Sequence, residues 1–134
     1  MDDYFSPLLP DETLRGLSSL GLAHVGDAVY ELLVRTWLAL HGKATGRGLH
    51  EAAIGLVRAE AQAEGAARIR PALTQEELSV FRRGRNAHPH TVPAHASRAQ
   101  YAEATALEAL FGWLYLTGQQ DRANELFRLI MEEA

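Results

Sequence analysis

The chain has 134 residues, 47% of them hydrophobic and 22% charged, with a net charge of −4 at pH 7, which fits a single globular domain with a modest core. Its lack of cysteine excludes disulfides, thiolate catalysis and cysteine-ligated zinc or iron–sulfur centres. No run approaches the roughly 18 apolar residues of a membrane span, and the acidic N-terminus lacks the features of a signal peptide, so we expect a cytoplasmic location and no membrane partner. Because period-two alternation and clusters of β-branched residues are scarce, the sequence predicts an all-α fold.

The first long helix is predicted over about 20–40, after a loosely structured segment of residues 1–19, so that residues 20–134 form the main domain. One apolar stripe of this helix is expected to face the core, and it contains Leu22, Val25, Val29, Leu32 and Thr36. Asp27 lies on the opposite face, where an acid ordinarily faces water. The same face also carries residues that suit water poorly, namely Leu20, Ala23, Tyr30 and Val34. We therefore expect this face to contact a second subunit or to line a groove.

Two further helices are expected in the middle of the chain. One covers about 49–65 and is rich in small packing residues. The other lies within 71–84, where Thr74 and Glu77 have the spacing of a capping box and Gly84 is expected to end the helix.

The segment 78–102 contains no acid, although the chain as a whole is negatively charged. Its side chains include donors suited to phosphate groups, and the candidates for RNA contact are Arg82, Arg83, Arg85, Asn86 and His88. A run of charge is commonly no more than a solvated surface. Because a proline-containing loop with further histidines follows, we favour contact with nucleic acid.

The last two helices are predicted over about 97–116 and 119–133, divided by Thr117-Gly118. The first of them places Glu108 within the apolar run ATALEALFGWLYL. A helix that is apolar on most sides is usually buried, so an ionised carboxylate there needs a compensating group.

Two explanations of Glu108 are open. In the first, it pairs with an arginine or accepts hydrogen bonds from tyrosine or backbone groups. In the second, it faces Asp27 across a helix–helix contact, and the two carboxylates hold a divalent cation. The small side chains of Ala104, Thr105 and Gly112 would let another helix approach closely.

Two motifs carry a resemblance to a known family. LAHVGDAVYEL resembles the signature helix of ribonuclease III endonuclease domains, and ATALEALFGWLYL resembles their second catalytic helix. The intervening RRGRNA is similar to the Mini-ribonuclease III subfamily, which consists of the catalytic domain alone. The resemblance runs from about Leu20 to Leu116 and implies a ribonuclease III-like helical fold that acts as a homodimer.

The resemblance also implies an activity: an endoribonuclease that cleaves double-stranded RNA and leaves 5′-phosphate and 3′-hydroxyl ends. Asp27 and Glu108 would be its catalytic residues and would bind Mg²⁺, with Mn²⁺ as a substitute. The implied substrate is the precursor of large-subunit (23S) ribosomal RNA. Three further positions that are acidic in ribonuclease III domains hold Leu20, Ala23 and Thr105 here. The Mini subfamily has the same reduced set of acidic residues.

Two alternatives are compatible with the same residues. The missing acids favour a non-catalytic ribonuclease III-like module that binds RNA or the ribosome, whereas the presence of both Asp27 and Glu108 argues against it. The net negative charge favours a small helical dimer that binds DNA or another protein, and the placement of Glu108 disfavours it.

Overall fold

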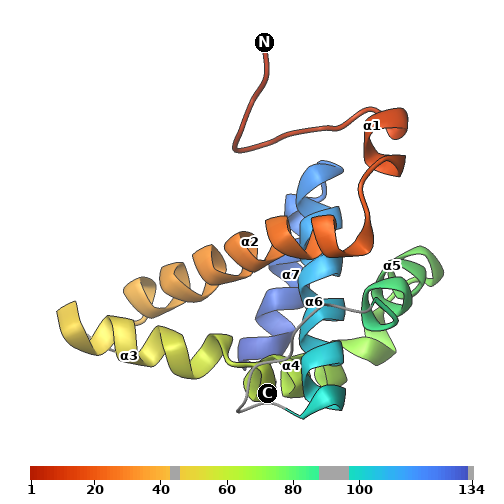
Figure 1. The fold of residues 1–134 in the computed structure, drawn as a ribbon. Helices are drawn as coiled ribbons and strands as arrows, with labels where there is room; N and C mark the ends of the chain where they lie inside the picture. Colours follow the sequence, from red (N-terminus) through yellow and green to blue (C-terminus); the bar gives the residue numbers. More distant parts are fainter. Residues whose placement is uncertain (43–45, 88–96, 133–134) are drawn as a thin grey trace.

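The structure is a computed structural model that describes residues 1–42, 46–87 and 97–132 of the chain (Figure 1). The elements in these ranges are helices, in agreement with the predicted all-α fold. In chain order they are α1 (Asp11–Arg15), α2 (Ser19–Leu40), α3 (Gly46–Val57), α4 (Ala59–Ile69), the short 3-10 helix η1 (Arg70–Ala72), α5 (Gln75–Arg85), α6 (Arg98–Leu116) and α7 (Gln120–Glu132). Within these ranges, none of the helices is long and apolar enough to cross a membrane.

Helix α6 is the centre of the domain. In Figure 1, α2 crosses in front of it and α7 lies behind it, and α4 and α5 also pack along it. Between Ala104 and Leu114 every residue except Glu108 is buried. A helix surrounded in this way has no face for water, which explains why its sequence is apolar on nearly all sides.

Helices α2 and α6 meet at two glycines. A Cβ atom at Gly26 would lie 1.6 Å from the carbonyl oxygen of Glu108, and a Cβ atom at Gly112 would lie 2.0 Å from that of Leu22. No side chain fits at such distances, so the two backbones touch only because both positions are glycine. The expectation that small residues near Glu108 let another helix approach is therefore confirmed at Gly112.

The predicted core stripe of α2 is wrong. Of its members only Leu22 is buried, and Leu32 is 57% exposed. The glycine crossing turns the other face toward α6, so that the buried residues besides Leu22 are Ala23, Gly26, Tyr30, Val34 and Leu38. The Tyr30 ring then packs edge-on against Phe111 and Phe127, with ring centroids 5.3 Å and 5.7 Å away. The face expected to meet a second subunit or a groove thus packs mainly inside its own chain.

The structure also differs from two predicted helix boundaries. The single helix expected over 49–65 is two helices, because the extended backbone of Arg58 separates α3 from α4. Gly84 does not end α5, which continues to Arg85. It lies instead against α6, where a Cβ atom would be 2.8 Å from the Cβ of Ala109, so its smallness serves helix packing.

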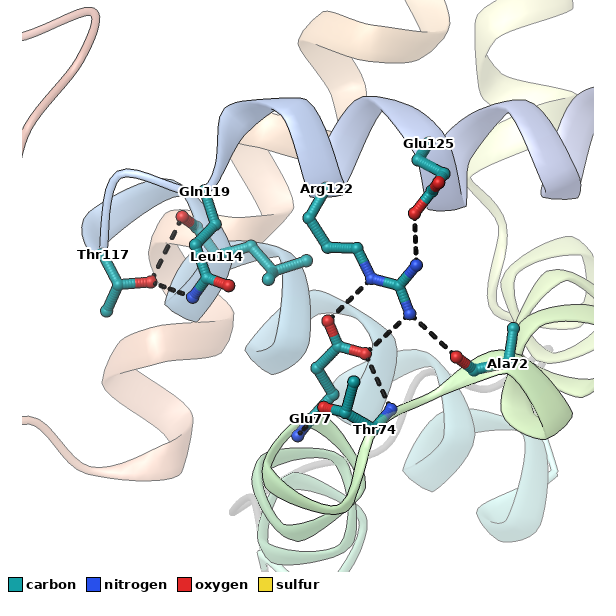
Figure 2. A network of polar contacts seen from close by, with 8 residues as sticks. All are labelled: Ala72, Thr74, Glu77, Leu114, Thr117, Gln119, Arg122 and Glu125. Atoms are coloured by element: carbon teal, nitrogen blue, oxygen red, sulfur yellow. Dashed lines mark hydrogen bonds and ion pairs between the residues drawn. The ribbon is translucent and has the colours of Figure 1, made fainter.

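A polar network joins the start of α5 to α7 (Figure 2). The predicted capping box is confirmed: Thr74 Oγ1 accepts from the backbone of Glu77, and Glu77 Oε1 accepts from the backbone of Thr74. From α7, the Arg122 guanidinium donates to both oxygens of Glu77, at 2.8 Å and 2.9 Å, and to the carbonyl oxygen of Ala72 at 2.8 Å. The Arg122 hydrogen bonds hold the pKa of Glu77 below its usual range, so this carboxylate is ionised and structural.

The N-terminal residues are tied to the junction of α6 and α7. The backbone N–H of Leu9 donates to the carbonyl oxygen of Leu116 at 2.9 Å, and Leu8 forms an isolated bridge with Thr117. The side chains of Tyr4 and Phe5 are nevertheless 81% and 84% exposed. The backbone of this segment is therefore fixed while its aromatic side chains face outward.

Candidate active site

Glu108 lies in the middle of α6 and is half-buried, although its neighbours in the chain are fully buried. Its Oε2 accepts a hydrogen bond from Nε2 of Gln62, at 3.3 Å. Gln62 lies on α4 and is only 2% exposed. A neutral amide orients a carboxyl group but supplies no opposite charge, so Gln62 does not neutralise Glu108 in this poorly hydrated position.

Asp27 approaches Glu108 from α2. It follows Gly26, the residue whose backbone touches Glu108, and its own side chain is exposed. Burial, and after it the negative charge of Asp27, raises the pKa of Glu108 to about 8. The structure therefore brings together the two acids that the sequence singled out, one on each of the crossing helices.

The arginine pairing considered for Glu108 is absent from the described ranges. Arginines there form ion pairs with other acids: Glu31, Glu60, Glu77, Glu103 and Glu125. Arg68 of α4 donates to the carbonyl oxygen of Ile130 at 2.6 Å. It is close enough to influence Tyr30, whose pKa is raised well above the usual range by burial, with Arg68 opposing the increase and Glu108 adding to it.

The residues present suit a divalent cation. Two carboxyl groups lie together without a basic partner among the described residues. A cation between them would offset both their mutual repulsion and the free-energy cost of burying a charge on Glu108. In these ranges no group of three or more His, Cys, Asp or Glu side chains could hold a metal. A two-carboxylate site suits Mg²⁺, which retains several waters and accepts substrate phosphates as further ligands.

The candidate RNA-contact residues lie at the end of α5. Arg82 and Arg83 are exposed, and Asn86 is the C-cap of the helix. Arg85 forms an ion pair with Glu103 of α6, with Nε and Oε2 2.5 Å apart. The positive charge of the acid-free segment 78–102 is thus partly neutralised by an acid of α6 that follows it in the sequence. His88 lies outside the described residues.

The structure adds two residues that sequence reasoning missed, Arg15 and Gln62. Arg15 of α1 and Arg83 of α5 line one cleft of about 310 Å³, whose wall includes Ser19 and Trp113. Gln62 was overlooked because the small residues around it suggested a packing helix only. The available signal was a lone amide on the same face of α4 as the buried Ala66 and Ile69.

Comparisons with known proteins agree with this arrangement. Residues 20–119 match the Ribonuclease III domain family. A crystal structure of a Fusobacterium nucleatum protein superposes with a TM-score of 0.81 at 29% identity, covering 88% of this chain and 96% of that one.

More similar relatives define the branch of the family. The chain is 46% identical over 112 residues to the Mini-ribonuclease 3 of Symbiobacterium thermophilum, covering 84% of this chain and 86% of the relative. It is 39% identical over 125 residues to the Mini-ribonuclease 3 of a Thermoanaerobacter species, covering 93% and 88%. The chain therefore belongs to the ribonuclease III domain family, and within it to the Mini-ribonuclease III group. It is an endoribonuclease, as the resemblance of its two helical motifs implied.

Proposed function

We propose that this endoribonuclease cleaves double-stranded RNA with Mg²⁺, and that Asp27 and Glu108 are the metal-binding and catalytic residues. The observation that carries the proposal is the carboxylate pair at the α2–α6 crossing, which has no basic partner among the described residues. Enzymes of the ribonuclease III family generally depend on a divalent metal and act on RNA, which agrees with such a site.

The chemistry divides between the metal and the chain. When bound, a divalent cation lowers the pKa of a bound water and stabilises negative charge on the phosphate and its leaving oxygen. Gly26 and Gly112 fix the separation of the two helices and hence of the two acids. The exposed position of Asp27 leaves the pair open to an RNA phosphate, whereas the buried Gln62 holds Glu108 from inside the fold. The expected products are 5′-phosphate and 3′-hydroxyl ends.

RNA binding in this proposal depends on the basic end of α5. Arg82 and Arg83 are exposed and have no acid partner in the described part of the chain, and Arg15 shares a cleft with Arg83. Asn86 would extend this surface, Arg85 would order it through Glu103, and His88 stays a candidate for RNA contact from the sequence. Because A-form RNA is recognised mainly by its shape and its 2′-hydroxyls, we expect little sequence preference. The ribosomal RNA precursor remains the proposed physiological substrate on family resemblance alone.

The proposed homodimer would use the exposed stripe of α2. Leu32 is 57% exposed, and it lines an apolar groove of about 370 Å³ together with Val25, Val29, Tyr4 and Phe5. Apolar surface of this kind on a small domain commonly marks a contact with another protein surface. A second copy of the chain suits it because an apolar patch can be self-complementary about a two-fold axis.

The direct test incubates a long double-stranded RNA with the protein in MgCl₂ or in EDTA, beside the Asp27→Asn and Glu108→Gln variants. We expect cleavage only by the unsubstituted protein in Mg²⁺, with RNA binding and helical content retained in both variants. Competition by double-stranded DNA and single-stranded RNA would establish the substrate class. Cleavage that persists in EDTA or in either variant would refute the proposed site.

A further inference from the structure

The buried face of α4 contains one polar side chain that its packing does not require. The buried residues of this helix are Gln62, Gly65, Ala66 and Ile69. Three of them are small or apolar, as expected for a helix that packs against α6 and α7. A buried amide at such a position destabilises the fold unless it finds a hydrogen-bond partner. The partner that Gln62 finds is Glu108, at 3.3 Å.

The choice of an amide has a chemical consequence at this position. A lysine or arginine there would form an ion pair with Glu108 and would compete with any cation. An apolar side chain would leave the carboxylate without this donor and free to turn. A glutamine donates one hydrogen bond to Oε2 and carries no charge, so the other oxygen of Glu108 stays available and no side-chain cation competes for the carboxylate.

We propose that Gln62 is a positioning residue for the metal site, which fixes the Glu108 carboxylate next to Asp27 while leaving its charge for a divalent cation. The inference rests on the proposed function, because it takes Asp27 and Glu108 as the metal-binding pair. Arg68, the nearby cation on the same helix, is engaged with the carbonyl oxygen of Ile130 and does not take over this role. Gln62 touches neither RNA nor metal in this scheme and acts through Glu108 alone.

The experiment compares Gln62→Met and Gln62→Lys with the unsubstituted protein. Thermal unfolding followed by circular dichroism over a series of MgCl₂ concentrations reports metal binding, and initial cleavage rates over the same series report activity. The matched control is Gln119→Met, which removes a side-chain hydrogen bond to Thr117, 2.7 Å long, away from the two acids.

In Gln62→Met, we expect the Mg²⁺ concentration that gives half of the thermal stabilisation to rise roughly 10- to 100-fold, as for the loss of other groups that orient a metal ligand. Cleavage should show the same displacement, with most of the rate recovered at saturating Mg²⁺. In Gln62→Lys, the ammonium should pair with Glu108, raise the melting temperature in EDTA and abolish stabilisation by Mg²⁺. Gln119→Met should retain the Mg²⁺ midpoint of the unsubstituted protein.

The possible failures are distinguishable. A Gln62→Met protein with an unchanged Mg²⁺ midpoint, or a Gln62→Lys protein that Mg²⁺ still stabilises, would overturn the role of Gln62 while the metal site stands. If Mg²⁺ fails to stabilise the unsubstituted protein, or stabilises Glu108→Gln equally, the metal site itself is refuted. Should Gln62→Met not fold, Gln62→Asn replaces it. The shorter side chain keeps the amide but does not reach Glu108, so the same rise in the Mg²⁺ midpoint is expected.

Discussion

At the scale of single residues, Glu108 is held where its charge is unfavourable. Burial and the neighbouring Asp27 raise its pKa to about 8, so the folded protein without metal binds a proton there more tightly than the unfolded chain does. Such a group lowers folding stability as the pH rises above its unfolded pKa, by up to about 1.4 kcal/mol for each pH unit until the folded pKa is reached. Sites that must bind a ligand commonly retain unfavourable groups of this kind.

We therefore predict that Glu108→Gln melts several degrees higher than the unsubstituted protein in EDTA at pH 8, because the amide keeps the shape and removes the charge. Thermal unfolding by circular dichroism measures this. Glu64→Gln, an exposed acid on α4, is the matched control and should leave the melting temperature nearly unchanged. A lower melting temperature for Glu108→Gln would mean that the carboxylate stabilises the fold.

A second residue-scale prediction concerns Arg83. Because its guanidinium is exposed and lines the same cleft as Arg15, Arg83→Glu should weaken binding of double-stranded RNA and reduce the salt dependence of the affinity. Affinity measured at several KCl concentrations tests this. Arg128→Glu, which makes the same charge change at an exposed position of α7, should have a smaller effect. Equal effects of the two substitutions would indicate that only net charge matters.

At the scale of elements, two contacts fix how the helices pack. The glycine crossing sets the distance between α2 and α6, and the Arg122–Glu77 network fastens α5 to α7 (Figure 2). The first contact depends on the absence of side chains and the second on hydrogen bonds to a nearly buried carboxylate. Both are made between segments far apart in the sequence.

The ion pair leads to a prediction about pH. Glu77→Gln keeps an acceptor for the capping box but loses the charge, so we expect the free energy of unfolding at pH 7 to fall by about 1–3 kcal/mol. Because the folded pKa of Glu77 is lowered, its contribution is complete above its ordinary pKa of 4.5 and is lost as the pH falls further. Urea denaturation at pH 7 and pH 3 measures the difference, which should shrink at pH 3. The neighbouring, exposed Glu76→Gln is the control, and a difference independent of pH would contradict the assignment.

At the scale of the whole molecule, the unused apolar surface is on the outer side of α2 and the N-terminal segment. Leu32, Phe5 and Tyr4 are more than half exposed and line one groove. The backbone of the N-terminal segment is held against the end of α6, so this surface is already formed in the single chain. A second copy could bind it without further folding.

We predict that Leu32→Asp converts a dimer into a monomer, because a carboxylate at the centre of an apolar contact would be desolvated without a partner. Size-exclusion chromatography with light scattering measures the mass. Leu40→Asp, at the exposed end of the same helix, is the control and should remain dimeric. A monomeric unsubstituted protein, or a dimeric Leu32→Asp, would show that this surface serves another purpose.

The sequence by itself determined most of the helices, the capping box at the start of α5 and the two acids of the candidate site. Local signals were sufficient for these: Thr74 and Glu77 carry the spacing of a cap, Gly118 provides the positive φ between α6 and α7, and Glu108 stands out in an apolar helix. The family was also evident, because its two motifs are contiguous stretches of the chain.

The tertiary structure decided what these elements touch. Periodicity identified two apolar faces of α2 and favoured the wrong one as the core face, because the close approach at Gly26 and Gly112 turns the other face toward α6. Likewise Glu103 and Arg85, or Gln62 and Glu108, become neighbours only when distant helices pack. Local sequence patterns determine the conformation of each segment. The partner of a buried polar or charged side chain depends on packing between distant segments, so local patterns could not identify these partners.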